Sequence, residues 1–538
     1  MSELLTAAQM KAIEAAPIAS GVVTGLELME RAGAGVVAAV LAEWPEMALA
    51  PQRAMVLCGP GNNGGDGFVV ARLLKARGWA VEVYLYGDAS KLPADARVNY
   101  ERWCELGEVR SAETFAPLET EADLYVDALF GIGLSRPLNG AAGQISKELE
   151  SSARNHRGQI VAVDVPSGLC SDSGRDLSIV NGGGLRADLT VTFQFHKLGH
   201  FLADGSEHCG KILCVDIGLD CGAAMKVLGE WYDPLTKTKP NGSVAVLFPQ
   251  RWMECDYRGA NSILTKWGGH KFSHGHALIC SGDHGQAGAA RLAARGALRI
   301  GAGLVTVASP PAAMAENAAR LDAVMLKPVA DAAKLAEVLA DTRITAVCLG
   351  PGMGVVRAAE LLPVAVRAKH TPCIVLDADA LTAVALDPAL LALLNDRCVL
   401  TPHAGEFARL FPDIAERLAA PATQGPAYSK VDATREASAR AGCVVLYKGA
   451  DTVIATPDGR CSINAAVYER SAPWLAAAGS GDVLAGFITG LLARGFQPMQ
   501  AAETAAWLHV ECARSFGPGL IAEDLPEELP KVFRALGV

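Results

Sequence analysis

The sequence lacks the features that mark several classes of protein. Its 14 cysteines are scattered and include no Cys-x-x-Cys pair, which argues against a disulfide scaffold or a zinc module and favours reduced thiols. No stretch approaches about 18 uninterrupted apolar residues, and charged residues interrupt the N-terminal segment where a signal peptide has an apolar core. We therefore expect a cytoplasmic protein without a membrane span.

Charge and composition exclude two further classes. The chain carries 58 acidic and 48 basic residues, and its net charge of −10 argues against a nucleic-acid partner. Apolar residues make up 51% and charged residues 20% of the 538 residues, a balance that supports a large core and excludes general disorder. Glycine is abundant, with 55 residues in neither a collagen period nor a linker. We expect much of it in turns that bring backbone close to ligands.

Short apolar runs alternate with helix-like segments from Arg53 onward, a pattern typical of a parallel sheet covered by helices on both faces. The expected strands of the first half are residues 53–58, 80–86, 124–128, 159–163, 188–193 and 211–217. The alternation stops near Leu219, and a second series follows at residues 276–281, 304–309, 346–349, 373–376, 398–401, 443–447 and 452–455. We predict two α/β domains, residues 1–228 and 229–538, without short internal repeats.

A glycine-rich loop, GPGNNGGDG at residues 59–67, follows the first of these strands. It satisfies G-x-G-x-x-G, in which backbone N–H groups and a helix N-terminus approach a pyrophosphate. The acidic residue that a dinucleotide-binding dehydrogenase places about 20 positions later is missing, so that class fits poorly. The paired asparagines and Asp66 add oxygen atoms that suggest a hard cation or a polar ring beside the phosphates.

Two more strand ends carry loops with reactive side chains, DALFGIGLSRP at residues 127–137 and DVPSG at residues 164–168. In open α/β sheets ligands bind at the carboxyl ends of strands, so Asn63, Asp127 and Asp164 can converge on one crevice with Ser167. The alternative that Asp164 and Ser167 only cap a turn stays open.

The second half contains AGSGDVLAG at residues 478–486, at the start of a helix. Small residues leave the N–H groups of the helix N-terminus free to hold a transferring phosphoryl group, and Asp482 stands where it could take a hydroxyl proton. No Walker A sequence is present. The alternative is an aspartate that the helix dipole favours in the first turn.

Three further strand ends carry polar loops: GPGMG at residues 350–354, TPHAGE at 401–406 and KGADT at 448–452. Each places flexible backbone or a polar side chain where the ligand of the second sheet would lie. We expect His403 to contact that ligand, although a histidine in the core is the commoner case.

The motifs of the first half, LLTAAQMKAIEAA, GLELMERAG, NNGGDG, DALFGIGL and VDVPSG, together resemble the NAD(P)H-hydrate epimerase domain of the YjeF family. The resemblance implies a Rossmann-like three-layer domain with a parallel sheet, and a K⁺ ion held by Asn63, Asp127 and Ser167. Epimerisation needs proton transfer, for which Asp164 is the candidate acid or base. The residues implied to bind hydrated NADH or NADPH are Asn62, Asn63, Gly64, Gly65, Asp66, Gly131, Ile132, Gly133, Leu134, Ser135, Arg136, Pro137 and Asp164.

The motifs of the second half, GPGMG, LDADAL, LTPHAGEF, KGADT and AGSGDVLAG, resemble the ADP-dependent NAD(P)H-hydrate dehydratase domain of the same family, which has a ribokinase-like α/β/α fold. The resemblance implies that Asp482 deprotonates the substrate hydroxyl, that ADP phosphorylates it, and that Mg²⁺ accompanies the nucleotide. Two segments depart from the family pattern, residues 465–477 and 286–287. The implied nucleotide ligands are Lys448, Gly449, Ala450, Asp451, Thr452 and Gly481, and Ala289, Gly352, His403 and Asp482 are implied to face the hydrated cofactor.

These resemblances predict a bifunctional enzyme that epimerises the R and S hydrates of NADH and NADPH and dehydrates the S form with ADP, giving AMP and phosphate. An adenine nucleotide and the two hydrates are the expected small-molecule partners, and we expect a homo-oligomer. One alternative is a small-alcohol kinase fused to a regulatory nucleotide-binding domain. Another makes the first half a binding or assembly module.

Overall fold

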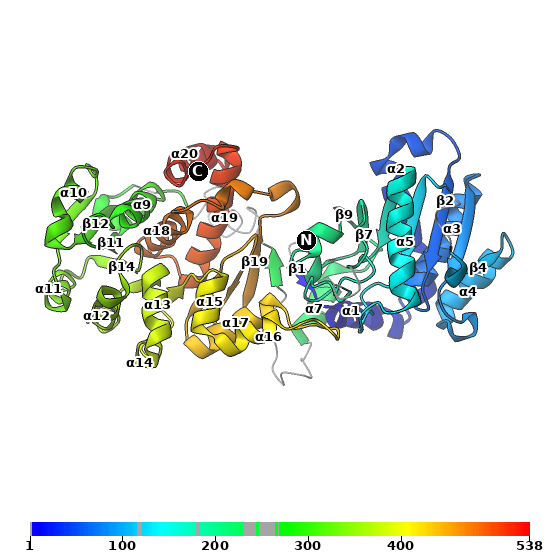
Figure 1. Cartoon of the computed structure of the whole chain (residues 1–538), viewed down its shortest axis with the longest axis horizontal. Helices are drawn as coiled ribbons and strands as arrows, with labels where there is room; N and C mark the ends of the chain where they lie inside the picture. The colour runs from blue at the N-terminus through cyan, green and yellow to red at the C-terminus, as the bar shows by residue number, and fades with distance from the viewer. Residues whose placement is uncertain (1–2, 116–120, 179–182, 231–243, 247–263, 267) are drawn as a thin grey trace. The chain divides into compact units, whose positions relative to one another are not determined.

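The structure is a computed structural model that describes residues 3–115, 121–178, 183–230, 244–246, 264–266 and 268–538. The chain divides into two compact units (Figure 1). The first contains Glu3–Val244 and Ala420–Lys430, and the second contains Ala245–Ala419 and Val431–Val538. The domain boundary expected between residues 228 and 229 stays a prediction, because residues 231–243, directly beyond α7 (Cys221–Glu230), lie outside the described residues.

The first unit is built on a seven-stranded parallel sheet with the order β4-β3-β2-β5-β6-β7-β9. A second, short pairing joins β1 (Glu3–Leu5) and β8 (His196–Lys197) in parallel. The carboxyl ends of β2, β5 and β6 lie side by side at the centre of the sheet. The strands are β2 (Arg53–Cys58), β3 (Ala80–Leu85), β4 (Val109–Ser111), β5 (Leu124–Ala128), β6 (Gln159–Val163), β7 (Leu189–Phe193) and β9 (Lys211–Val215).

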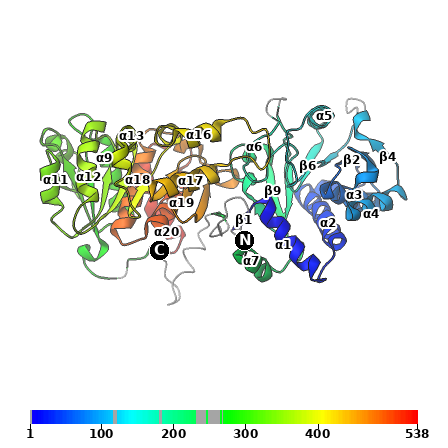
Figure 2. The same cartoon turned by 90° about the horizontal axis from the view of Figure 1, so that it is seen from below.

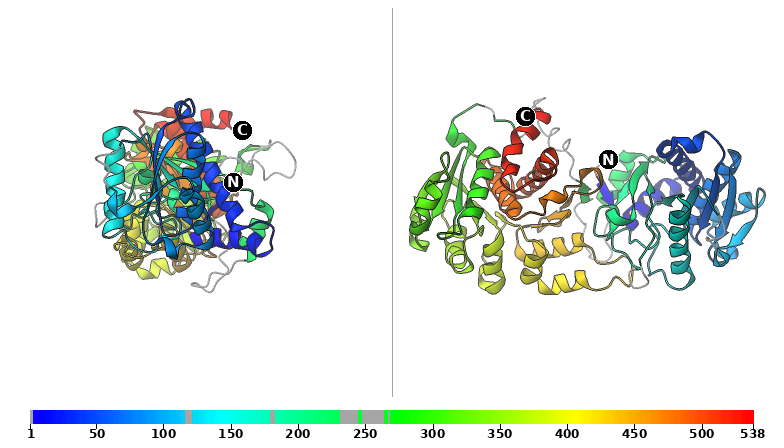
Figure 3. Two further views of the ribbon diagram at one scale, coloured as in Figure 1. Left: turned by 90° about the vertical axis from the view of Figure 1, so that its right-hand side faces the viewer. Right: turned by 45° about the horizontal axis from the view of Figure 1, so that its top comes forward.

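Helices cover both faces of this sheet, as the alternation of apolar residues predicts (Figure 3). Along β2, Ala54 and Val56 pack in one hydrophobic cluster with helices α2 and α3, whereas Met55 and Leu57 pack in another with α5. The unit therefore has three layers. Its helices are α1 (Ala7–Ala19), α2 (Gly25–Glu43), α3 (Asn62–Ala76), α4 (Ala94–Cys104), α5 (Ala141–His156), α6 (Gly205–His208) and α7.

The second unit has a larger, mixed sheet with the order β13-β12-β11-β14-β15-β16-β17-β18-β19-β10. Its strands are parallel from β13 to β17, and β18 then pairs antiparallel with both β17 and β19. The strands are β10 (Val244–Val246), β11 (His276–Cys280), β12 (Leu304–Ser309), β13 (Met325–Pro328), β14 (Ile344–Leu349), β15 (Cys373–Leu376), β16 (Cys398–Leu400), β17 (Val444–Tyr447), β18 (Asp451–Ala455) and β19 (Cys461–Ala465).

Helices lie on both sides of this sheet too, with the late helices of the chain on one side and the middle ones on the other (Figures 2 and 3). The helix α18 (Ser480–Ala493) packs against α9 (Gly288–Arg299) at close range, since a Cβ atom on Gly486 would lie 2.1 Å from the carbonyl oxygen of Ala293. The others are α10 (Met314–Ala318), α11 (Ala332–Val338), α12 (Val355–Val366), α13 (Ala378–Leu386), α14 (Pro388–Leu391), α15 (Ala404–Leu410), α16 (Pro412–Ala419), α17 (Lys430–Ala441), α19 (Pro498–Phe516) and α20 (Asp524–Ala535).

The α/β class expected for both halves is confirmed, and each strand expected from the apolar pattern is present within two residues at either end. The pattern missed the edge strands β4 and β13, whose residues are half-buried or exposed and therefore carry little apolar signal, and it also missed the buried β19, whose sequence CSINA is interrupted by two polar residues. Among the described residues, no helix combines the length and apolarity that crossing a membrane requires.

Candidate functional sites

A cavity of about 560 Å³ lies in the first unit, at the carboxyl ends of its central strands. It brings together three segments that the sequence placed in one crevice, the start of α3, the loop after β5 and Asp164 after β6. Of the expected binding residues, Gly64, Gly65 and Pro137 do not line it. The lining comprises Lys11, Glu14, Pro60, Gly61, Asn62, Asn63, Asp66, Pro93, Leu129, Phe130, Gly131, Ile132, Gly133, Leu134, Ser135, Arg136, Asp164 and Phe193.

Asp164 is held rigidly at the edge of this cavity. Its backbone adopts a positive φ of 69°, in the left-handed region that aspartate enters more readily than most residues other than glycine. The Oδ1 atom accepts hydrogen bonds from Thr192 Oγ1 at 2.8 Å and from Lys197 Nζ at 2.6 Å. The Oδ2 atom points toward the loop after β5, since it lies 3.5 Å from where a Cβ atom of Gly131 would be. One carboxylate oxygen is thus occupied, and the other faces the ligand loop.

Glycines allow the loops around the cavity to approach one another. A side chain on Gly64 would collide with the carbonyl oxygen of Gly59 at 2.1 Å, so the turn before α3 can close only with glycine there. A Cβ atom on Gly131 would lie 2.8 Å from Asn63 Oδ1. No side chain caps the N-terminus of α3, and Asn62 and Asn63 of its first turn line the cavity, so the start of this helix is a potential phosphate site.

Asp127 and Ser167 lie together behind the cavity lining. Asp127 is fully buried and accepts hydrogen bonds from Ser167 Oγ at 2.6 Å, from the Ser167 backbone N–H at 2.8 Å and from the Leu129 N–H at 3.2 Å. Burial nevertheless raises the pKa of Asp127 to about 6, because none of these donors carries a charge. The site therefore has the negative charge and the oxygen atoms that a hard cation would stabilise.

Two ionisable side chains at this site were not expected from the sequence. Lys197, on β8, is 1% exposed and forms the ion pair with Asp164. Glu14, on α1, lines the cavity, and burial raises the pKa of its carboxyl to about 7. Neither segment carries a glycine-rich turn after a strand, the pattern that marks the other residues of this site.

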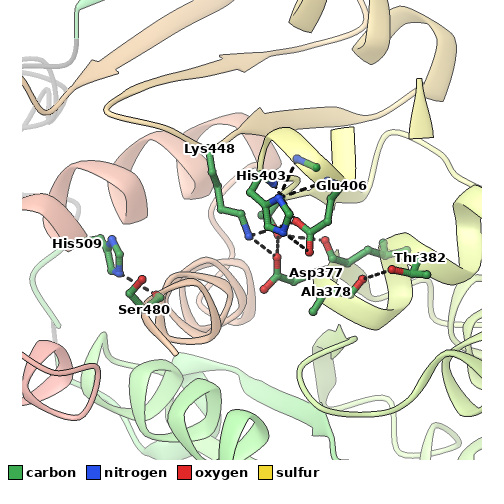
Figure 4. A network of polar contacts seen from close by, with 11 residues as sticks. Asp377, Ala378, Thr382, His403, Glu406, Lys448, Ser480 and His509 are labelled. Carbon is green, nitrogen blue, oxygen red and sulfur yellow. Dashed lines mark hydrogen bonds and ion pairs between the residues drawn. The ribbon is translucent and has the colours of Figure 1, made fainter. Parts of the chain in front are cut away.

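A network of charged groups forms the centre of the second unit (Figure 4). Lys448, directly after β17, donates a hydrogen bond from Nζ to Asp377 Oδ1 at 2.8 Å, and its Nζ lies 3.6 Å from Glu406 Oε2. Thr401 Oγ1 also donates to Asp377 Oδ1, at 2.8 Å. The motifs LDADAL, LTPHAGEF and KGADT therefore meet at one place, and Asp377 and Glu406 are functional candidates that their sequence motifs did not single out.

Asp482 lies in the first turn of α18, beside this network. Burial and the nearby Asp377 carboxylate raise its pKa to about 7, although the Lys448 ammonium opposes the shift. A Cβ atom on Gly481 would lie 3.4 Å from Lys448 Nζ, so glycine there lets the lysine approach the helix N-terminus. Asp482 can therefore accept a proton near neutral pH, as a general base must.

His403 caps α15 and remains half-exposed, with 56% of its side chain accessible. Its Nδ1 atom accepts hydrogen bonds from the N–H groups of Gly405 at 3.0 Å and Glu406 at 3.3 Å. The other ring nitrogen, Nε2, lies 3.5 Å from Glu406 Oε1. His403 is therefore not a core histidine, and its exposed edge is available to a ligand.

The loops that carry Ala289 and Gly352 also meet. A Cβ atom on Gly352 would lie 3.4 Å from Ala289 Cβ and 2.4 Å from the carbonyl oxygen of Gln286. Gln286, one of the two departures from the family pattern, therefore contributes backbone rather than a required side chain to this contact. In the other departure, residues 465–477, Arg470 anchors the chain through hydrogen bonds to Glu511 at 3.1 Å and Asn464 at 3.1 Å.

The expected nucleotide segment, residues 448–452, forms the turn between β17 and β18. Thr452 Oγ1 donates to the Gly449 carbonyl at 2.7 Å and accepts from the Gly449 N–H at 3.1 Å, which closes the turn. Asp451 begins β18, and the Ala450 carbonyl accepts from the Ala466 N–H at 2.6 Å. The turn therefore holds Lys448 beside Gly481.

Gly350→Ala is expected to destabilise the second unit by about 3 kcal/mol or more. Gly350 has a φ of 121°, and its Cβ would lie 1.7 Å from the carbonyl oxygen of Asp377. Gly354→Ala is the matched control, because Gly354 has a φ of 77° in the same loop but open space around its Cβ. We expect Gly354→Ala to lower the free energy of unfolding by about 1 kcal/mol, from backbone strain alone. Urea unfolding of the second unit measures the loss of unfolding free energy in both variants. Equal losses would contradict the steric explanation.

Each half of the chain is similar to known proteins. Residues 25–199 match the family described as YjeF-related protein N-terminus, and residues 277–531 match the family described as NAD(P)H-hydrate dehydratase. The NAD(P)H-hydrate epimerase of Rhodobacter capsulatus is 50% identical over 203 residues, which cover 37% of this chain and 92% of that protein. A solved ADP/ATP-dependent NAD(P)H-hydrate dehydratase from Bacillus subtilis is 26% identical and covers 51% of this chain and 93% of that chain, with a TM-score of 0.40.

A further relative spans both units. The bifunctional NAD(P)H-hydrate repair enzyme Nnr of Moorella thermoacetica is 34% identical over 560 residues, which cover 99% of this chain and 97% of that protein. The similarity thus includes the two halves in the same order and is not limited to one of them. The chain belongs to the family of bifunctional NAD(P)H-hydrate repair enzymes.

Proposed function

We propose that this enzyme repairs hydrated NADH and NADPH in two steps, epimerising the R and S hydrates in the first unit and dehydrating the S hydrate with ADP in the second. The observation that carries the proposal is that each unit presents an aspartate among the loops at the carboxyl ends of its strands, the buried Asp164 in the first and the half-buried Asp482 in the second. Two activities in one chain are chemically useful, because both hydrates form while only the S form is consumed.

In the first unit, the cavity would bind the hydrated cofactor between α3 and the loop after β5. The N–H groups of Asn62 and Asn63 at the start of α3 would bind its phosphates, and the segment from Gly131 to Arg136 would close over the ring. Pro137 would shape the end of that loop. The free Oδ2 of Asp164 would take the proton from the hydroxyl group on the nicotinamide ring.

Asn63, Asp127 and Ser167 are the residues that would hold K⁺. Their carboxylate, hydroxyl and amide oxygens suit a hard, weakly polarising cation, and the buried charge of Asp127 lacks a cationic partner among its hydrogen-bond donors. Bound K⁺ would supply positive charge next to the substrate loop. The hydrogen bond from the Phe130 N–H to Ser167 Oγ, 3.0 Å long, links this site to that loop.

In the second unit, Asp482 would deprotonate the substrate hydroxyl, whose oxygen then attacks the terminal phosphorus of ADP. The products of that step are AMP and a phosphorylated hydrate. The lone pair of the ring nitrogen then expels phosphate to give an iminium ion, and loss of a proton from the neighbouring ring carbon forms the double bond of the dihydronicotinamide. Phosphate is a far better leaving group than hydroxide, so the transfer is what makes the elimination feasible.

Lys448 and the turn to Thr452 would bind the nucleotide together with the N–H groups of Gly481 and its neighbours at the start of α18. Mg²⁺ would accompany the ADP phosphates and neutralise part of their charge. Ala289, Gly352 and His403 would face the hydrated cofactor, because the loops that carry them provide close backbone contact and an exposed imidazole edge.

We place the enzyme in a reducing cytoplasm, since every cysteine that the structure describes is a free thiol. We also propose that it forms a homo-oligomer, which light scattering coupled to size exclusion would test.

The deciding experiment incubates the purified chain with a mixture of R and S NADH hydrates, with and without ADP, and follows the recovery of NADH absorbance. Full recovery that needs ADP supports both activities. Recovery of the S portion alone contradicts the epimerase, and a stable phosphorylated product favours the small-alcohol kinase. Loss of an oligomer, without loss of epimerisation, on mutation of Asp164 would favour an assembly module.

Lys448→Met is expected to weaken ADP binding and to destabilise the second unit by about 3–5 kcal/mol, because Asp377 and Glu406 lose their buried cation. It also removes the group that lowers the pKa of Asp482, so the pH dependence of dehydration should shift toward higher pH. Lys531→Met is the control. Lys531 forms an ion pair with Glu528, and its own side chain is exposed to solvent. Ion pairs exposed to solvent contribute about 0–1 kcal/mol to stability. An unchanged pH profile in the Lys448 variant would contradict this coupling.

A further inference from the structure

Glu14 is a carboxyl group in the epimerase cavity with no role in the function described so far. It lies one helical turn after Lys11 on α1, and both side chains line the same cavity as Asp66 and Asp164. The charged groups that face it are Lys11 on its own helix, Asp66 on α3, Asp164 after β6 and Lys197 on β8. It therefore shares the cavity with Asp164 but comes from a different element.

The two carboxyl groups differ in their contacts. Asp164 accepts a hydrogen bond from the ammonium group of the buried Lys197 and a second one from Thr192. Burial raises the pKa of Glu14 to about 7, repulsion from Asp164 adds to the shift, and the Lys197 and Lys11 ammonium groups oppose it. A cavity that holds one ion-paired carboxylate and one carboxyl group that burial keeps protonated to near neutral pH offers both partners of an acid and base pair.

We propose that Glu14 is the proton donor of the epimerase, paired with Asp164 as the proton acceptor. This inference rests on the proposed epimerase function and adds a second catalytic residue to it. Asp164 takes the proton of the hydroxyl group on the ring carbon next to the ring nitrogen. As the C–O bond becomes a carbonyl, the C–N bond breaks, its electron pair stays on nitrogen, and nitrogen takes the proton of Glu14.

The resulting open-chain aldehyde can rotate about the bond to its neighbouring carbon and present its other face. Ring closure then reverses the proton transfers: nitrogen attacks the carbonyl carbon and returns its proton to Glu14, and the oxygen recovers its proton from Asp164. The hydroxyl carbon has inverted its configuration, and both carboxyl groups are back in their starting states. No oxidant, reductant or second substrate is consumed.

The test compares Glu14→Gln with Glu46→Gln in the full-length chain, using purified R and S NADPH hydrates without ADP and following their interconversion by chromatography. Glu46 is exposed, and it lies outside the cavity lining. We expect Glu14→Gln to lower the kcat of interconversion by about 10²-fold or more with little change in KM, because a general acid contributes about 10²–10⁴-fold. ADP-dependent dehydration of the S hydrate should be unchanged.

The pH profile gives an independent readout. The kcat of the unmodified enzyme should fall as pH rises through about 7, where Glu14 loses the proton that it must donate, and Glu14→Gln should lack that limb. The inference would be overturned if Glu14→Gln interconverts the hydrates within threefold of the unmodified rate. It would also be overturned if the kcat of the unmodified enzyme does not change between pH 6 and 8.

Two other outcomes remain informative. If the unmodified chain does not interconvert the hydrates at all, the epimerase function itself fails, which is a different result. If Glu14→Gln does not fold, the pH profiles of kcat for the unmodified enzyme and for the Glu14→Asp variant test the inference instead. Glu14→Asp should keep the pH limb at a reduced rate, and loss of that limb would overturn the inference.

Discussion

Asp482→Asn is expected to lower the kcat of ADP-dependent dehydration by about 10²–10⁴-fold, the contribution of a general base in a well-positioned site. The amide has nearly the same shape as the carboxyl group but cannot accept the hydroxyl proton. ADP binding should persist, because Lys448 and the start of α18 stay in place. Rates with purified S hydrate and saturating ADP measure the effect.

The pH dependence of the unmodified enzyme checks the same role. The pKa of Asp482 is raised to about 7, so the dehydration rate should increase as pH rises through 7 and the base becomes ionised. Asp482→Asn should lack this limb. The variant should not lose stability at neutral pH, since it removes repulsion between the Asp482 and Asp377 carboxyl groups. Dehydration within tenfold of the unmodified rate would show that another group is the base.

Epimerisation provides the matched control for this variant. Asp482 lies in the second unit, and the cavity proposed for epimerisation is lined only by residues of the first. The interconversion of R and S hydrates should therefore proceed at the unmodified rate. A parallel loss of both activities would instead indicate misfolding of the chain.

Asp164→Asn is expected to abolish epimerisation, with a loss of about 10²–10⁴-fold in kcat, and also to destabilise the first unit. The second effect has a separate cause. Lys197 is 1% exposed, and the variant removes the carboxylate with which its ammonium group forms a 2.6 Å ion pair. Removing one member of a buried ion pair typically costs about 3–5 kcal/mol, and we expect the lower end because asparagine still accepts a hydrogen bond.

The double variant Asp164→Asn, Lys197→Met separates the two effects. It replaces the buried charge with an apolar side chain of similar length, so the stability of the first unit should return toward that of the unmodified protein. Epimerisation should stay lost. Thermal unfolding and the interconversion of purified hydrates are the two measurements, with ADP-dependent dehydration as the internal control. A full epimerisation rate in Asp164→Asn would show that Asp164 is not the proton acceptor.

Local sequence patterns were sufficient for the strands and for most of the loops that carry the sites. Buried parallel strands such as β2 and β5 are nearly continuous apolar runs, and their ends are marked by glycine-rich turns. Topology then brings the carboxyl ends of neighbouring strands together, which is why Asn63 and Asp164 could be assigned to one crevice. These relations depend on residues close in sequence and on a general rule of α/β sheets.

The sequence by itself thus determined the α/β class, the motifs and the candidate aspartates Asp164 and Asp482. Only the tertiary structure revealed the charged groups around them, which are Lys197 and Glu14 in the first unit and Asp377 and Glu406 in the second. The physical reason is that a pKa depends on burial and on charges within a few ångströms. Those charges come from distant segments, so no local pattern identifies them.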